Sequence, residues 1–61
     1  MEELITYRER VYLDNYRCID YERKCIMRRP WIMGGLLYGY INQFSVKSIA
    51  LEDIISREKI N

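Results

Sequence analysis

Two adjacent glycines, Gly34-Gly35, lie between two apolar runs and are the strongest local constraint on how this chain can fold. Glycine tolerates the positive φ angles that a two-residue β-hairpin turn requires. In a helix, each of the three glycines found within six positions here would cost about 1 kcal/mol relative to Ala. We therefore expect Met27–Met33 and Leu36–Phe44 to form an antiparallel pair. Because proline cannot donate a backbone hydrogen bond, Pro30 predicts an edge strand or a bulge in the first of these strands.

The segment before the hairpin, residues 2–28, carries apolar residues at seven-residue spacing. They form two columns, Leu4, Val11, Cys18 and Cys25, and Ile5, Tyr12, Ile19 and Ile26. Acidic residues at the start and basic residues at the end of the segment suit a helix macrodipole, and Pro30 would stop a helix. These features predict one amphipathic helix, although Arg8, Asn15 and Glu22 fall between the two columns.

A hairpin is the alternative structure for the same segment. Its strands would be Thr6–Leu13 and Tyr16–Arg23, joined by an Asp14-Asn15 turn. Four tyrosines, together with Val and Ile, are typical of strands. The N-terminal part of the chain is therefore either one long helix or two strands.

The last segment, Ser45–Asn61, shows the signals of a second helix. Ser45 and Ser48 are candidate N-caps, with acidic residues in the early turns and basic residues near the end. One apolar face at helical spacing consists of Ala50, Leu51, Ile54 and Ile55. We expect a C-terminal helix here, with a strand over Ser48–Ile54 as the alternative.

These elements predict an α+β fold for residues 1–61 as a single small domain: an N-terminal amphipathic helix, a glycine-turned β-hairpin and a C-terminal helix. A chain of 61 residues buries only about 60% of the surface that its unfolded form exposes, so its core is small. A two-stranded ribbon alone is barely stable in water. We therefore expect a homodimer, formed through the long helix or the ribbon edge.

Two runs near the C-terminus match a known pattern: Ser45-Val46-Lys47-Ser48-Ile49-Ala50 and Ile55-Ser56-Arg57-Glu58-Lys59-Ile60. They resemble the first helix and the opening of the recognition helix in helix-turn-helix regulators. The second run departs from that motif in length, because six residues do not fill a major groove. Asp53 also stands where such motifs usually bury an aliphatic residue. The resemblance implies DNA binding.

A second pattern runs from Tyr38 to Ile54. It joins Gly39-Tyr40-Ile41, through a polar connection, to Ile49-Ala50-Leu51-Glu52-Asp53-Ile54. This segment resembles the second-motif hairpin of Sm-like and small SH3-like barrels. It implies a small SH3/Sm-like β-barrel as the alternative fold, without assigning a functional residue.

The chemistry available to this chain is narrow, because it has no histidine and two cysteines. Without histidine there is no Ser-His or Cys-His pair. The two cysteines also lack the Cys-x-x-Cys spacing that is typical of zinc sites. Cys18 and Cys25 would lie roughly 10 Å apart on a helix, beyond the ~7 Å that a disulfide bridges. We expect two buried thiols, no metal, no cofactor and no enzymatic activity.

Charge and hydropathy bound the partners and the location. A net charge of +1 argues against bulk attraction to nucleic acid or to an anionic membrane. The longest apolar stretch without a charge, Trp31–Ile41, has 11 residues, whereas a membrane-spanning helix needs about 20. The opening Met1-Glu2-Glu3 has the wrong charge for a secretory signal. We therefore expect no membrane association and a cytoplasmic location.

The remaining signal is a high density of tyrosine, tryptophan and arginine, the residue types most enriched at binding hot spots. Candidate partner-binding residues are Tyr12, Tyr16, Arg23, Arg28, Arg29, Trp31, Tyr38 and Tyr40. They predict a non-catalytic protein-binding module, an accessory or inhibitory factor of bacterial or phage type that occupies a surface of a larger host protein. The alternative is a small regulatory DNA- or RNA-binding protein, in which the same rings stack on bases.

Overall fold

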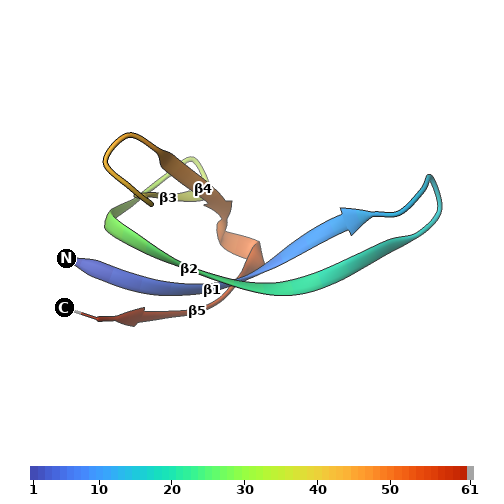
Figure 1. The fold of residues 1–61 in the computed structure, drawn as a ribbon, viewed down its shortest axis with the longest axis horizontal. Helices are drawn as coiled ribbons and strands as arrows, with labels where there is room; N and C mark the ends of the chain where they lie inside the picture. The colour runs from blue at the N-terminus through green and yellow to red at the C-terminus, as the bar shows by residue number, and fades with distance from the viewer. Residues whose placement is uncertain (61) are drawn as a thin grey trace.

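The computed structural model describes residues 1–60, which form five antiparallel strands and one short 3-10 helix (Figure 1). In chain order these are β1 (Glu2–Tyr12), β2 (Cys18–Met33), β3 (Leu36–Tyr40), β4 (Val46–Ala50), η1 (Leu51–Asp53) and β5 (Ile54–Lys59). One sheet contains all five strands in the order β4-β3-β2-β1-β5. The chain therefore places its last strand beside its first.

The sheet is strongly bent, so that β3 and β4 lie over the concave side of β1 and β2 (Figure 1). Its core holds one or two side chains from each of four strands: Ile5, Tyr7, Met27, Leu37 and Ile49. Side chains alternate between the two faces of a strand, which explains why Ile5 and Tyr7 both point into the concave side. Cys25 and Ile54 pack against this core and are partly buried.

A two-stranded arm, residues Arg8–Arg23, extends beyond this core. β5 pairs with β1 only as far as Tyr7, and β3 pairs with β2 only from Arg28 onward. The arm therefore contains only β1 and β2 and their connecting turn, and it projects from one end of the sheet (Figure 1). It makes the molecule elongated, with dimensions of 40 × 21 × 19 Å.

The predicted N-terminal helix is wrong, because residues 2–28 form β1, a turn and most of β2. The hairpin alternative describes this segment, with strand register Tyr7↔Arg23 and Val11↔Ile19 around the turn. The Asp14 carboxylate stabilises that turn by accepting hydrogen bonds from the backbone N–H groups of Tyr16 and Arg17, at 2.8 and 2.9 Å. The polar residues that interrupt the helical pattern are explained by this hairpin. Two of the polar residues between the apolar columns, Arg8 and Glu22, lie opposite each other in the arm, and the third is in the turn.

The predicted C-terminal helix is also wrong, and the α+β fold class with it. Within Ser45–Ile60 the chain forms β4, η1 and β5, and residue 61 lies outside the described residues. Ile49 and Ile54 pack on the core, while Leu51 and Ile55 are 39% and 50% exposed. A helix would have buried all of that apolar face, but pairing of β5 with β1 satisfies the backbone instead.

These strands also overturn the helix-turn-helix resemblance, since its two runs lie in β4 and β5. The segment that resembles an Sm-like hairpin does form an antiparallel pair, with Gly39 opposite Lys47. Of the two fold classes that the sequence suggested, the one built of strands lies nearer to the observed sheet, since residues 1–60 contain no α-helix.

The glycine-turned hairpin is confirmed as a pairing of β2 with β3. Gly34 and Gly35 have φ angles of +60° and +77°, which L-residues with side chains rarely adopt. The predicted bulge at Pro30 is present as well, because the β2–β3 register shifts between Arg28 and Trp31. The bulge places Arg29 at φ 50°, and its backbone N–H donates to the Met1 carbonyl at 3.0 Å.

Gly39 allows the backbone of β3 to lie close to the Met27 side chain of β2. A Cβ atom at this position would lie 2.6 Å from Cβ and 2.8 Å from Sδ of Met27, a fully buried residue of the core. Glycine is therefore required here by the approach of the two strands.

The prediction of two buried thiols is wrong in part. Cys18 and Cys25 are free thiols, with Cys18 exposed at the first residue of β2 and Cys25 partly buried. Separately, among residues 1–60 no helix is long and apolar enough to cross a membrane.

Candidate binding surface

Three aromatic side chains gather on the convex face of the sheet, and we call them the aromatic cluster: Trp31, Tyr38 and Tyr40. Trp31 lies opposite Tyr38 in the β2–β3 register, and the two rings stack with centroids 5.3 Å apart and planes 11° apart. The ring of Tyr40 is tilted by 49° against Trp31, at 5.8 Å. Because Leu37 faces the core, the alternation of β3 turns its tyrosines outward.

The aromatic cluster remains open to solvent despite these contacts. Trp31 and Tyr40 are each 38% exposed. Stacking fixes the rings relative to one another, so the cluster presents a rigid apolar surface with a hydroxyl at its border. Such a surface loses little side-chain entropy on binding.

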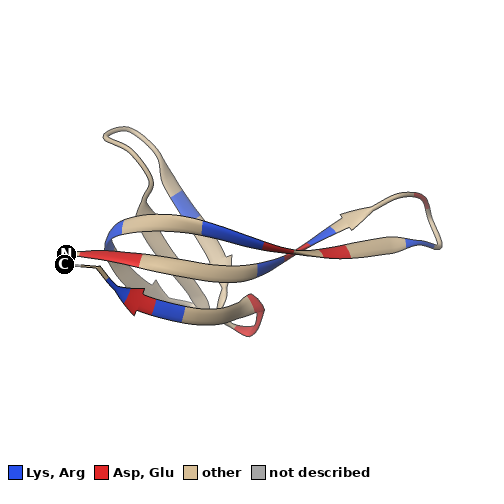
Figure 2. Cartoon of the chain, turned by 60° about the horizontal axis from the view of Figure 1, so that its bottom comes forward, with Lys and Arg blue, Asp and Glu red and all other residues tan. Residues whose placement is uncertain are grey.

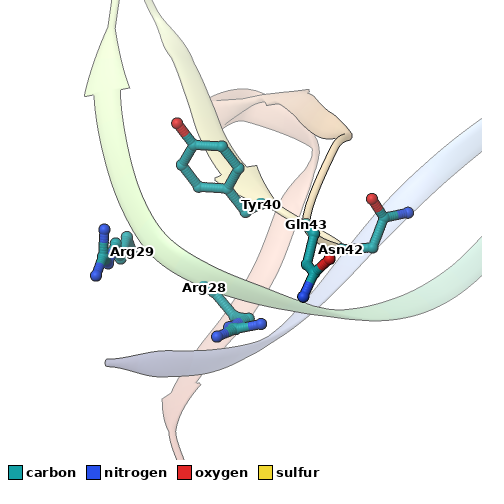
Figure 3. A pocket seen from close by; sticks show the side chains of 5 residues that line it. All are labelled: Arg28, Arg29, Tyr40, Asn42 and Gln43. Atoms are coloured by element: carbon teal, nitrogen blue, oxygen red, sulfur yellow. The ribbon is translucent and has the colours of Figure 1, made fainter.

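A hollow of about 260 Å³ adjoins the cluster. Figure 3 shows its lining from three segments: the bend of β2, the end of β3 and the loop that follows β3. The lining residues are Arg28, Arg29, Tyr40, Asn42 and Gln43. Cations and amide groups thus stand directly beside an aromatic ring, an arrangement suited to carboxylates or phosphates next to an apolar group.

The two arginines of the hollow differ from the four arginines that form ion pairs within residues 1–60. Four arginines form ion pairs within the chain: Arg10 with Asp20, Arg17 with Asp14, Arg23 with Glu9 and Arg57 with Glu3. Arg28 and Arg29 form none with residues 1–60, so their charge is available to a partner. β2 also carries Arg23 and Lys24 on the side of this bend that leads to the arm (Figure 2).

The remaining predicted site residues lie on the arm, away from the aromatic cluster (Figure 1). Tyr12 and Tyr16 are 71% and 96% exposed beside the turn. Arg23 donates to Glu9 at 3.0 Å, and its guanidinium carbon lies 5.2 Å from the centre of the Tyr21 ring. The predicted set is therefore divided into two surfaces.

Asn42 and Gln43 are site residues that the sequence reasoning missed. The sequence predicts a strand over Leu36–Phe44, but β3 ends at Tyr40, so both residues belong to the loop that follows it. Asn42 also shapes this loop, because its side-chain oxygen accepts a 2.8 Å hydrogen bond from the Phe44 backbone N–H. The two consecutive polar residues shortly after Tyr40 are the sequence signal that indicates a loop with hydrogen-bonding side chains beside that ring.

Asp20 accepts a 2.9 Å hydrogen bond from Arg10 across the arm, which lowers the pKa of its carboxyl group. No group of three Cys, Asp or Glu side chains that could hold a metal ion occurs in residues 1–60.

Comparisons with protein families, curated proteins and solved structures find no match to this chain. The candidate surface is therefore defined by its own geometry: a fixed aromatic cluster beside a hollow with two arginines that form no ion pair within residues 1–60.

Proposed function

We propose that this chain is a non-catalytic protein-binding module that docks on a larger protein through the aromatic cluster and the adjacent hollow. The observation that carries the proposal is the contact of exposed aromatic rings with a hollow whose two arginines have no ion-pair partner in residues 1–60. Aromatic and arginine side chains dominate the energetics of protein interfaces. A partner that covers the rings also desolvates the arginines, which favours a partner with carboxylates at that place.

The proposed role is that of an accessory or inhibitory factor of bacterial or phage type, acting in the cytoplasm. A small sheet with a rigid binding surface is able to cover a site on a larger protein. Nine isoleucines and one alanine also fit an AT-rich genome, which is common in such sources. The class of partner is therefore a host protein with an acidic and apolar surface.

Site-specific photo-crosslinking tests the proposal. A photoreactive phenylalanine analogue replaces Tyr40 in one variant and Ser56 in the other, since Ser56 is exposed on β5. In extracts of the source cells, the analogue at position 40 should form one dominant protein adduct and the analogue at position 56 should not.

A matched variant makes this test specific. Asparagine tolerates the positive φ angle of position 29, so Arg29→Asn removes the charge while preserving the bulge. This substitution should reduce the adduct severalfold. Equal adducts from both positions, or an adduct that Arg29→Asn leaves unchanged, would argue against this surface.

The second candidate function is binding of single-stranded nucleic acid, which the stacking of Trp31 on Tyr38 beside two arginines favours. Aromatic platforms with adjacent cations bind bases at about 1–3 kcal/mol per stacked base. Fluorescence anisotropy with labelled single-stranded DNA and RNA at about 50 mM and about 200 mM salt decides the point. Binding that weakens with salt and with Trp31→Ala supports this function, and its absence at low salt rejects it.

A further inference from the structure

The edge of β2 away from β1 has no neighbouring strand over Cys18–Met27, among the residues that the structure describes. We call this segment the free edge of β2. Its outward backbone N–H and C=O groups form a template for another strand. The arm that carries most of this edge is a two-stranded ribbon, which is marginal in water without further pairing. A further strand that pairs with the free edge of β2 would stabilise the arm.

We propose that a second copy of the chain pairs with this free edge, antiparallel, about a two-fold axis that passes through Glu22. In this register Asp20 faces Lys24 of the second copy, and Tyr21 faces Arg23. Ile19 faces Cys25 in the same way. Each of these pairs occurs twice by symmetry, so the edge is complementary to itself in charge and in apolar character.

Neighbouring registers are less favourable. A two-fold axis perpendicular to the sheet keeps the same face of both copies on the same side of the combined sheet. The alternative registers therefore correspond to axes through successive residues of β2. An axis through Tyr21 places Asp20 opposite Glu22 twice, so like charges face each other. An axis through Arg23 places that arginine opposite itself and pairs Glu22 with Lys24 twice, but it sets Asp20 against Ile26 and loses the contact of Tyr21 with Arg23.

The proposed register has one like-charge pair, Glu22 with its own copy. Arg8 lies directly opposite Glu22 on β1 of the same chain, so each carboxylate has a cation on its other side. Asp20 also retains bonding capacity, because Arg10 bonds to Oδ1 and leaves Oδ2 for Lys24 of the second copy. The cost of the central pair is therefore small beside the flanking attractions.

A hollow beside this edge has room for the incoming strand. It measures about 630 Å³ and is lined by core and edge residues, among them Tyr7, Lys24, Cys25, Ile41 and Lys47. Lys47 already contacts the Tyr7 ring, with its ammonium nitrogen 5.3 Å from the ring centre. The arm of one copy thus covers the apolar hollow of the other.

A disulfide across the two-fold axis tests the register. In a C18S/C25S background, Glu22→Cys places two thiols opposite each other, at the Cα separation of about 4.5–5.5 Å that a disulfide spans. The Cys25→Ser variant, which keeps Cys18 as its only thiol, is the control. The two copies of Cys18 would be eight residues out of register, about 26 Å apart along the strands. Mild oxidation should give a covalent dimer with Glu22→Cys and little with Cys25→Ser.

Sedimentation equilibrium of the reduced, natural chain measures the same association without new thiols. Lys24→Glu should weaken dimerisation by about tenfold, because it places two like-charge pairs in the edge. Glu22→Gln should strengthen it severalfold. A chain that stays monomeric at about 100 μM, or equal crosslinking by both cysteine variants, overturns the proposal.

The test is independent of the proposed docking function. Arg29→Asn alters the hollow beside the aromatic cluster and leaves the free edge of β2 intact, so it should reduce partner binding without changing dimerisation. Lys24→Glu should do the reverse. Circular dichroism of each variant shows that the sheet is retained.

Discussion

Arg57 in β5 holds the buried carboxylate of Glu3 in β1 through two parallel hydrogen bonds. Nε donates to Oε1 at 2.7 Å, and the terminal Nη2 donates to Oε2 at 2.9 Å. The two residues are 54 positions apart, and Glu3 is only 4% exposed. This pair joins the last strand to the first, and it makes an otherwise costly buried carboxylate tolerable.

Arg57→Ala should lower the free energy of unfolding by about 2–3 kcal/mol, because it leaves the Glu3 carboxylate buried without its partner. Urea denaturation at neutral pH measures this loss. Ser56→Ala, on the same strand and exposed, is the control and should change stability by less than about 0.5 kcal/mol. The double variant Glu3→Leu/Arg57→Leu should be more stable than Arg57→Ala, since it removes both charges.

The same pair makes stability depend on acid pH. The hydrogen bond from Arg57 lowers the pKa of Glu3 below its ordinary value of 4.5. Because the folded-state pKa is depressed, the contribution is fully present above pH 4.5 and is lost as pH falls through the folded-state value. Urea midpoints should therefore decrease below pH 4.5. Glu3→Gln, less stable at neutral pH, should show a flatter acid limb; an equally steep limb would assign the effect to other carboxylates.

Gly39→Ala should destabilise the sheet by about 1–3 kcal/mol, because the new methyl group would collide with Met27 in a close-packed core. Thermal unfolding followed by circular dichroism measures the change. Ser48→Ala on the neighbouring strand β4 is exposed and should be nearly neutral. Combining Gly39→Ala with Met27→Ala should recover part of the loss, since the smaller side chain makes room; no recovery would place the strain elsewhere.

Local chemistry predicted the central hairpin correctly. Gly34-Gly35 and Pro30 each restrict the backbone at their own position, so the turn and the bulge follow from residues adjacent in sequence. The terminal segments depend on pairing between distant residues. Nothing local to β5 shows that β1 lies beside it, and the heptad spacing of apolar residues mimicked a helix in strands that alternate every second residue.

The candidate site was predicted in part for a related reason. Arg28, Arg29 and Trp31 lie close in sequence, and the hairpin brings Tyr38 and Tyr40 opposite them. Composition alone also selected tyrosines of the arm, because exposed aromatic residues look alike until the fold separates them. The division into a convex aromatic surface and a free strand edge required the register of β2.

The two thiols should differ in reactivity, although they lie on the same strand. Cys18 is exposed, whereas Cys25 is partly buried against the core, and this burial raises the pKa of its thiol. Because the thiolate is the reactive form, an alkylating reagent at about pH 7.5 should modify Cys18 several times faster.

Mass spectrometry of time points measures both rates. The protein should be dilute, so that a second copy does not cover the edge. In denaturing urea the two rates should converge, because the difference comes from the folded environment of Cys25. Equal rates in the native chain would show that the β2 edge opens near the core faster than the reagent reacts.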